Sequence, residues 1–95
     1  MTGKTVRVQI SGQVQGVWFR GWAQQEATRL GLSGWIRNRV DGRVDALFSG
    51  VEDDVDQMLD LCWQGPGLAK VKSVEIEQDE PPEQGGFRVV RAPDD

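Results

Sequence analysis

Alternating apolar and polar positions near the start of the chain predict a β-strand over about Thr5 to Ser11. Apolar residues fall on every second position there, which is typical of a strand with one buried face. From about residue 20 the apolar spacing changes to three and four residues, which predicts an amphipathic helix ending near Leu30. The apolar positions of these two elements are Val6, Val8 and Ile10, followed by Phe19, Ala23, Ala27 and Leu30.

A β-hairpin follows this helix. Residues 32–38 and 43–49 both have strand-like alternation, and Asp41-Gly42 between them is a strong signal for a tight turn. On the first of these strands Gly34, Ile36 and Asn38 share one face, because side chains two residues apart point the same way. The hairpin therefore places Asn38 at the end of a strand.

The second half of the chain predicts one more helix and two more strands. Residues 51–63 have helical spacing with three acids in the first turn, and Gly65-Pro66-Gly67 ends the helix. A strand over about 69–78 comes next, and a slip in its alternation indicates a bulge near Lys72-Ser73. After a polar loop over residues 79–86, residues 87–91 form a short final strand.

This order of elements predicts an α+β fold, a ferredoxin-like split β-α-β sandwich with a short fifth strand and two helices on one face of a mostly antiparallel sheet. Residues 1–95 are enough for a single domain. In this topology the first two strands run in the same direction with the third between them. The loop over residues 13–19 and Asn38 should therefore meet at one edge of the sheet, and the acids at 52–54 should lie at the opposite edge.

Charge is distributed unevenly along the chain. The net charge is −4, but the first fifty residues carry seven basic and three acidic side chains, and the remaining residues carry four basic and twelve acidic ones. The positive half contains the loop over residues 13–19, so the local field favours an anion there. The arginines of the hairpin, Arg37, Arg39 and Arg43, are expected to form a solvated basic rim rather than direct ligands.

Composition removes several kinds of chemistry. The chain has no histidine and one cysteine, which argues against a transition-metal site and against an internal disulfide. Cys62 lies among apolar positions of the second helix and is expected to be a buried thiol rather than a nucleophile. With 38% hydrophobic and 27% charged residues and no long apolar run, the chain is expected to be a cytoplasmic globular protein without membrane contact.

The junction between the first strand and the first helix has the features of an anion site. The first N–H groups of a helix have no partner within it and carry the positive end of its dipole. Gly12 and Gly16 allow the loop to turn further N–H groups toward one point, and Arg20 adds a guanidinium suited to phosphate. By itself this pattern is weak, because glycine before a helix usually marks only a turn.

Two longer motifs resemble the signatures of the acylphosphatase family. Residues 12–20, Gly-Gln-Val-Gln-Gly-Val-Trp-Phe-Arg, match the family pattern G-x-V-Q-G-V-x-F-R at every fixed position. Residues 34–38, Gly-Trp-Ile-Arg-Asn, with Asp41-Gly42 after them, resemble G-W-V-R-N with a nearby D-G turn, and Ile36 replaces valine. The resemblance covers nearly the whole chain and makes a phosphate site the leading hypothesis.

The resemblance implies a hydrolase without metal or other cofactor that cleaves an acyl phosphate into a carboxylate and phosphate. It implies that Arg20 and the loop amides bind the phosphoryl group, and that Asn38 positions the attacking water. A phosphate or sulfate anion is expected to occupy the same loop. The expected phosphate-binding residues are Gln15, Gly16, Val17, Trp18, Phe19 and Arg20, and the expected catalytic residues are Arg20 and Asn38.

Phosphoryl transfer depends mainly on placed donors and electrostatic stabilisation, so one arginine, several amides and one neutral carboxamide suit the reaction. The proton acceptor stays open between Asp41, Asp45 and a phosphate oxygen of the substrate. The last is favoured, because a carboxylate beside the phosphate would repel it. Trp18, beside the loop, could line the entrance of the site.

Other functions remain as alternatives. The same fold could serve as an anion-binding or acyl-phosphate-binding module without turnover. A single-strand nucleic-acid binder would need exposed aromatic residues on a basic sheet face, and the chain does not show that arrangement. We therefore expect a monomer that acts on a small-molecule acyl phosphate and binds no nucleic acid. The sequence does not identify the acyl group.

Overall fold

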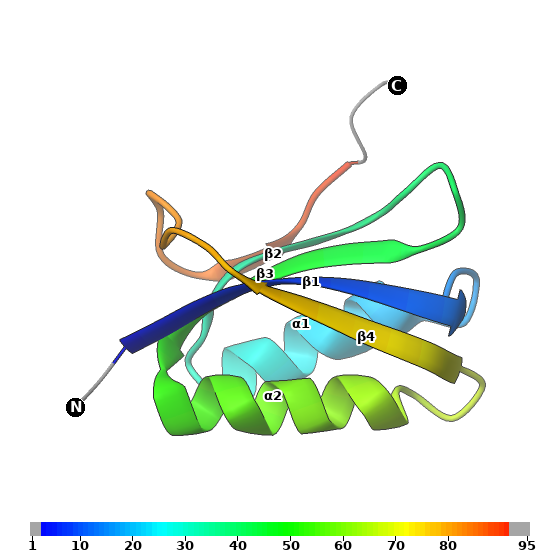
Figure 1. The fold of residues 1–95 in the computed structure, drawn as a ribbon, viewed down its shortest axis with the longest axis horizontal. Helices are drawn as coiled ribbons and strands as arrows, with labels where there is room; N and C mark the ends of the chain where they lie inside the picture. Colours follow the sequence, from blue (N-terminus) through cyan, green and yellow to red (C-terminus); the bar gives the residue numbers. More distant parts are fainter. Residues whose placement is uncertain (1–2, 92–95) are drawn as a thin grey trace.

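The structure is a computed structural model that describes residues 3–91 (Figure 1). Within this range the chain forms five strands and two helices. Their order is β1 (Gly3–Gln13), α1 (Phe19–Arg29), β2 (Ser33–Asn38), β3 (Val44–Val51), α2 (Glu52–Gln64), β4 (Lys70–Gln78) and β5 (Phe87–Val89). All seven predicted elements are present, and most of their boundaries lie within one or two residues of the predicted ones.

The five strands form one sheet in the order β4-β1-β3-β2-β5. Strand β3 lies between β1 and β2 and is antiparallel to both, so β1 and β2 run in the same direction, as predicted. Strand β4 is antiparallel to β1, and only β5 pairs in parallel, with β2. Both helices cover the same face of the sheet, and no helix within residues 3–91 covers the other face (Figure 1). The predicted ferredoxin-like α+β fold is confirmed.

The core lies between this sheet and the two helices. Burying these side chains removes apolar surface from water, which is the main favourable term in folding. Each strand contributes alternate residues, and each helix contributes one stripe at three- and four-residue spacing. The fully buried members include Val6, Val8 and Ile10 of β1, Ile36 of β2, Val44, Ala46 and Phe48 of β3, Phe19, Ala23 and Ala27 of α1, and Val55, Met58 and Cys62 of α2.

Cys62 is fully buried in this core. Burial raises the pKa of its thiol to about 12, because the charged thiolate is poorly solvated there. A thiol that stays protonated at neutral pH is a poor nucleophile. The interpretation of Cys62 as a packing residue is therefore confirmed.

The predicted bulge in β4 is present, and it explains why residue 12 is a glycine. Ser11 pairs with Ser73 while Gly12 pairs with Val71, so Lys72 is the extra residue of β4. A Cβ atom on Gly12 would lie 2.2 Å from the carbonyl oxygen of Lys70, and its φ of +126° is unfavourable for other residues. Sequence reasoning assigned Gly12 to the anion loop, but β1 extends to Gln13 and Gly12 instead allows close pairing beside the bulge.

Three connecting segments lie at one end of the molecule: the β1–α1 loop, the β2–β3 turn and the α2–β4 loop (Figure 1). Helix α2 begins at the opposite end, directly after β3. The acids at 52–54 are therefore far from the β1–α1 loop, as predicted. No helix within residues 3–91 is both long enough and apolar enough to cross a membrane.

Candidate functional site

The loop between β1 and α1, residues 14–18, contains two residues with a left-handed backbone, separated by Val17. Gly16 has a φ of +75°, and Trp18, the N-cap residue of α1, has φ +64° and ψ +26°. Trp18 is the only non-glycine residue with a positive φ within residues 3–91. For an L-residue this conformation costs about 1–2 kcal/mol, so the surrounding contacts must hold it.

The N–H groups of this loop are available to a ligand. Within residues 3–91, the N–H groups of residues 15–18 donate to no backbone or side-chain acceptor. Phe19 and Arg20 begin α1, where the first N–H groups also lack an intrahelical partner. The junction thus offers a series of donors together with the positive end of the α1 dipole, which suits a tetrahedral oxyanion.

A small hollow of about 110 Å³ opens at this junction. This is roughly the liquid volume of four water molecules, and it suits a small oxyanion. The hollow brings Arg20 and Asn38 together, although they are eighteen residues apart in the chain, and the described part of its lining contains no carboxylate. The lining residues are Val14, Gly16, Trp18, Phe19, Arg20, Gly21 and Asn38.

Arg20 lies in the first turn of α1 and is half-buried. Within residues 3–91 its guanidinium forms no hydrogen bond and no ion pair. Every other arginine from Arg7 to Arg88 donates at least one side-chain hydrogen bond. Arg20 therefore keeps its full donor capacity at the hollow.

Asn38 is the last residue of β2 and shares the helix-facing side of the strand with Gly34 and Ile36, as predicted. Its Oδ1 atom is buried and accepts no hydrogen bond from residues 3–91. A buried polar atom without a partner is rare in a folded protein and calls for an explanation. A carboxamide can accept from a water molecule and donate to an anion at the same time.

The side chain of Gln15 has a role separate from the phosphate binding expected of its backbone N–H. Its Nε2 donates to the carbonyl oxygens of Arg39 and Arg43, at 2.8 and 2.9 Å. These two carbonyls belong to the β2–β3 turn, so the side chain ties the loop to the turn that follows Asn38. Gln15 and Val17 do not line the hollow, so their expected contribution is limited to their N–H groups. Nothing in the sequence pattern indicated this link.

Three arginines surround Asp45 on the face of the sheet that has no helix. Val44 and Ala46 point into the core, so Asp45 between them points the other way. Its side chain is fully buried, and its Oδ2 accepts from Arg7, Arg37 and Arg39 at 3.2, 3.2 and 3.3 Å. The expectation of a solvated basic rim therefore needs correction, because Arg37 and Arg39 are ion-paired with a buried carboxylate, although neither of them lines the hollow as a direct ligand would. Arg43 pairs with Asp41 at 2.8 Å.

These contacts remove both carboxylates as bases at neutral pH. Burial alone would raise the pKa of Asp45, but the hydrogen bonds and charges of Arg37, Arg7 and Arg39 lower it below its usual value. Hydrogen bonds from the Arg43 side chain and backbone, with help from Arg39, lower the pKa of Asp41 to about 2. Neither carboxylate lines the hollow.

The same open face carries Trp35, which is half-buried and has two guanidiniums close to its ring. The Cζ atoms of Arg7 and Arg37 lie 5.5 and 5.0 Å from its ring centroid. Sequence reasoning found no aromatic residue on a basic sheet face, and this arrangement of Trp35 was missed. The two arginines are also paired with Asp45, so their charges are partly neutralised and their positions fixed.

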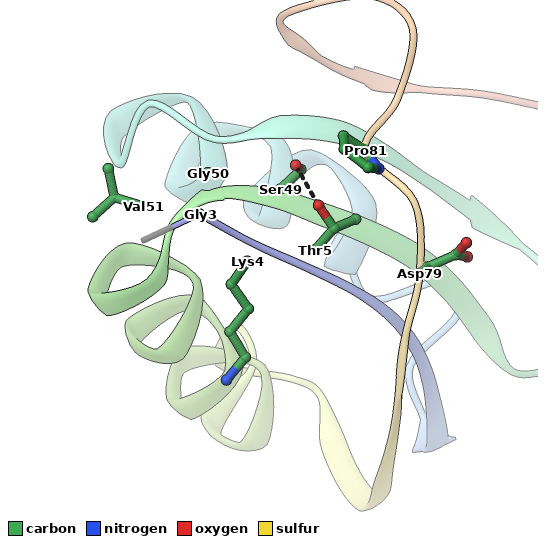
Figure 2. Close-up of a pocket in the computed structure, with 8 residues that line it drawn as sticks. All are labelled: Gly3, Lys4, Thr5, Ser49, Gly50, Val51, Asp79 and Pro81. Carbon is green, nitrogen blue, oxygen red and sulfur yellow. Dashed lines mark hydrogen bonds between the residues drawn. The ribbon is translucent and has the colours of Figure 1, made fainter. Parts of the chain in front are cut away.

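A larger depression lies at the opposite end of β1 and β3, next to the start of α2 (Figure 2). Its side chains are already engaged with one another. The hydroxyls of Thr5 and Ser49 share a hydrogen bond of 2.7 Å, and Lys4 extends toward α2, where it pairs with Asp56 at 2.7 Å. Asp79 also lines this depression and forms no ion pair within residues 3–91, so the one charge there without an ionic partner is negative, unlike Arg20 at the hollow. Within residues 3–91, no three His, Cys, Asp or Glu side chains lie close enough together to hold a metal ion.

Comparison with known proteins gives consistent matches. A family model described as Acylphosphatase matches residues 6–89. An acylphosphatase of Rhodospirillum rubrum is 51% identical over 84 residues, which are 88% of this chain and 92% of that protein. One from Alcanivorax borkumensis is 51% identical over 89 residues, covering 90% of this chain and 97% of that protein. The solved structure of an acylphosphatase from Coxiella burnetii has a TM-score of 0.88 at 33% identity and covers 93% of both chains.

Proposed function

The chain belongs to the acylphosphatase family and hydrolyses acyl phosphates, and on this basis we propose that Arg20, Asn38 and the N–H groups of residues 15–20 carry out the reaction. The observation that carries this proposal is the hollow itself. Within residues 3–91, it joins an arginine without an ionic or hydrogen-bond partner, a buried carboxamide oxygen without a donor, and a series of N–H groups without acceptors.

The phosphoryl group of the substrate binds at the loop. Its charged oxygens accept hydrogen bonds from the N–H groups of residues 15–20 and from the Arg20 guanidinium. Charge on these oxygens persists in the transition state, so donors fixed in advance stabilise it without reorganising. A carboxylate beside the phosphoryl group would repel it, and the described lining of the hollow contains none.

Asn38 holds the attacking water. Its Oδ1 accepts a hydrogen bond from the water, and the neutral carboxamide brings no negative charge close to the phosphoryl group. The water oxygen forms a bond to phosphorus, and the bond between phosphorus and the acyl oxygen breaks. The carboxylate leaves with the electron pair of that bond. A carboxylate is stable as an anion, so it requires little help from a general acid.

A phosphoryl oxygen of the substrate accepts the proton of the attacking water. The low pKa values of Asp41 and Asp45, and their location outside the hollow, support this assignment over a carboxylate base. The products are then a carboxylate and a phosphate that carries the proton. Arg20, the loop amides and Asn38 require no metal ion for these steps.

Two substitutions test the separate roles. Asn38→Ala should lower kcat by about a hundred- to a thousandfold, the usual effect of losing one transition-state donor, and leave competitive inhibition by inorganic phosphate nearly unchanged. Arg20→Ala should lose both turnover and phosphate inhibition, because it removes the phosphoryl contact. Release of phosphate from benzoyl phosphate, with a metal chelator present, measures turnover.

Near wild-type turnover in Asn38→Ala would remove the water-positioning role. Wild-type protein that binds phosphate but releases none from either benzoyl or acetyl phosphate would favour the alternative of a binding module on the same fold. A monomeric state stays a prediction. A cytoplasmic location stays a prediction.

A further inference from the structure

The hollow that holds Arg20 and Asn38 accommodates only part of the substrate. Its volume of about 110 Å³ suits the phosphoryl group, and the N–H donors and charge that surround it suit the same group. The acyl group of a bound substrate must therefore extend beyond the hollow. What it meets there decides which acyl phosphates the enzyme prefers.

Trp18 presents a large apolar surface at this position. The residue lines the hollow, and 59% of it is exposed, although tryptophan is highly buried on average. Phe19 and Trp22, its neighbours in the chain, pack against each other in the core region with ring centroids 5.3 Å apart. Trp18 alone of these three aromatic residues faces outward.

The indole of Trp18 is held in place against α1. A Cβ atom on Gly21 would lie 2.2 Å from Nε1 and 2.8 Å from Cδ1 of the ring, so the ring lies directly on the helix where the side chain is absent. Gly21 also lines the hollow. The left-handed backbone of Trp18 and the missing side chain of Gly21 together fix a flat aromatic surface beside the phosphoryl site.

We propose that Trp18 is a specificity-determining residue whose indole contacts the acyl group, so that the enzyme prefers acyl phosphates with an aromatic or bulky apolar acyl group. The proposal rests on the proposed function, since it assumes that the phosphoryl group binds at the loop. An aromatic acyl group can stack on the ring and lose its contact with water. An acetyl group is too small to stack on the ring or to bury a comparable apolar surface against it.

The test compares kcat/KM for benzoyl phosphate with kcat/KM for acetyl phosphate. The intrinsic reactivity of each substrate is the same with every variant, and a change in phosphoryl binding affects both substrates. The ratio of the two values therefore reports on the acyl contact. Trp18→Asn removes the ring, and Asn tolerates the left-handed backbone better than most residues. Trp18→Phe keeps an aromatic ring.

We expect the ratio to fall about five- to tenfold in Trp18→Asn, which corresponds to the usual strength of an aromatic pair, and to change less than twofold in Trp18→Phe. Gly21→Ala should also lower the ratio, because its Cβ displaces the ring while the tryptophan remains. Trp63→Gln is the matched control: Trp63 is 50% exposed on α2 and does not line the hollow, so its removal should not alter the ratio.

A ratio within twofold of the wild type in an active, folded Trp18→Asn variant would overturn the proposal. So would an equal fall in Trp63→Gln. Loss of phosphate release from both substrates by the wild-type protein would instead contradict the proposed function. Urea unfolding of each variant establishes that it is folded, and Gly21→Ala keeps the test valid if Trp18→Asn does not fold.

Discussion

Gln15 shows how one residue of the loop serves two purposes through different atoms. Its backbone N–H belongs to the donors around the phosphoryl site, while its side chain bridges two carbonyls of the β2–β3 turn. This bridge fixes the positions of the loop and of Asn38 relative to each other, although they come from different elements. Because buried polar groups cost stability when left without partners, this bridge affects both stability and binding.

Gln15→Ala should lower the free energy of unfolding by about 1–3 kcal/mol, because it removes two hydrogen bonds of about 0.5–1.5 kcal/mol each, while the Arg39 and Arg43 carbonyls keep their backbone donors. The loop should also become less fixed, so phosphate should inhibit more weakly. Urea unfolding and inhibition by inorganic phosphate measure the two effects. The matched control is Gln13→Ala at an exposed position of β1, which should change neither. Equal effects of the two substitutions would contradict the bridging role.

At the scale of elements, the end of the β2–β3 hairpin is held from the face opposite the hollow. Arg37 and Arg39 flank Asn38 in the chain, and both donate to the fully buried Asp45 of β3. Side chains alternate along β2, so the residues that bind Asp45 point away from the hollow while Asn38 points toward it. The ion cluster on the open face thus fixes the strand end that carries Asn38.

Asp45→Asn should lower the free energy of unfolding at pH 7 by about 1–3 kcal/mol, less than for a fully buried ion pair because the three arginines are partly exposed. The pKa of Asp45 is lowered in the folded state, so its charge stabilises the fold above the ordinary Asp value near pH 4. That stabilisation disappears as pH falls through the lower folded pKa.

The difference between wild type and Asp45→Asn should therefore narrow from pH 7 to pH 3 in urea unfolding. A difference that stays constant with pH would show that the charge of Asp45 is not responsible. Asp60→Asn provides the control, since Asp60 is exposed on α2 and forms no ion pair within residues 3–91. It should follow the wild-type pH dependence.

At the scale of the whole molecule, the fold places the phosphoryl site and the acids in the first turn of α2 at opposite ends of the sheet. The phosphoryl site lies where β1 and β2 end, and the acids Glu52, Asp53 and Asp54 lie at the start of α2, at the other end. There they complement the positive end of the α2 dipole. An acidic protein can therefore keep a site that attracts an anion, because screening by salt further weakens the effect of distant acids.

Asp53→Asn should lower the free energy of unfolding by about 0.3–1 kcal/mol, through the lost interaction with the helix dipole. KM for benzoyl phosphate should stay within twofold of the wild type, since Asp53 is at the far end. Urea unfolding and steady-state kinetics measure these values. A clear fall in KM would contradict the separation of charge, because it would mean that Asp53 repels the substrate. Asp60→Asn, near the other end of α2, should not destabilise the helix.

The sequence by itself determined the elements, their order and the two motifs. Periodicity of two and of three to four residues located all seven elements, because burial of one face imposes that spacing on each. The slip in alternation near Lys72 correctly indicated the bulge. The expectation that Arg20 and Asn38 share one edge also followed from topology, since crossover connections between parallel strands have a fixed hand.

Only the tertiary structure decided which atoms are free and which are engaged. Nothing in the sequence shows which of Arg20 and Arg37 has a free guanidinium. In the structure Arg37 is ion-paired with Asp45, and Arg20 has no partner within residues 3–91. Likewise, Gly12 belongs to the β1–β4 pairing, Gln15 reaches the β2–β3 turn, and the Trp18 indole rests on Gly21. Such contacts join residues whose spacing in the chain carries no periodic signal. They form only in the folded chain, where residues far apart in the sequence come close together in space.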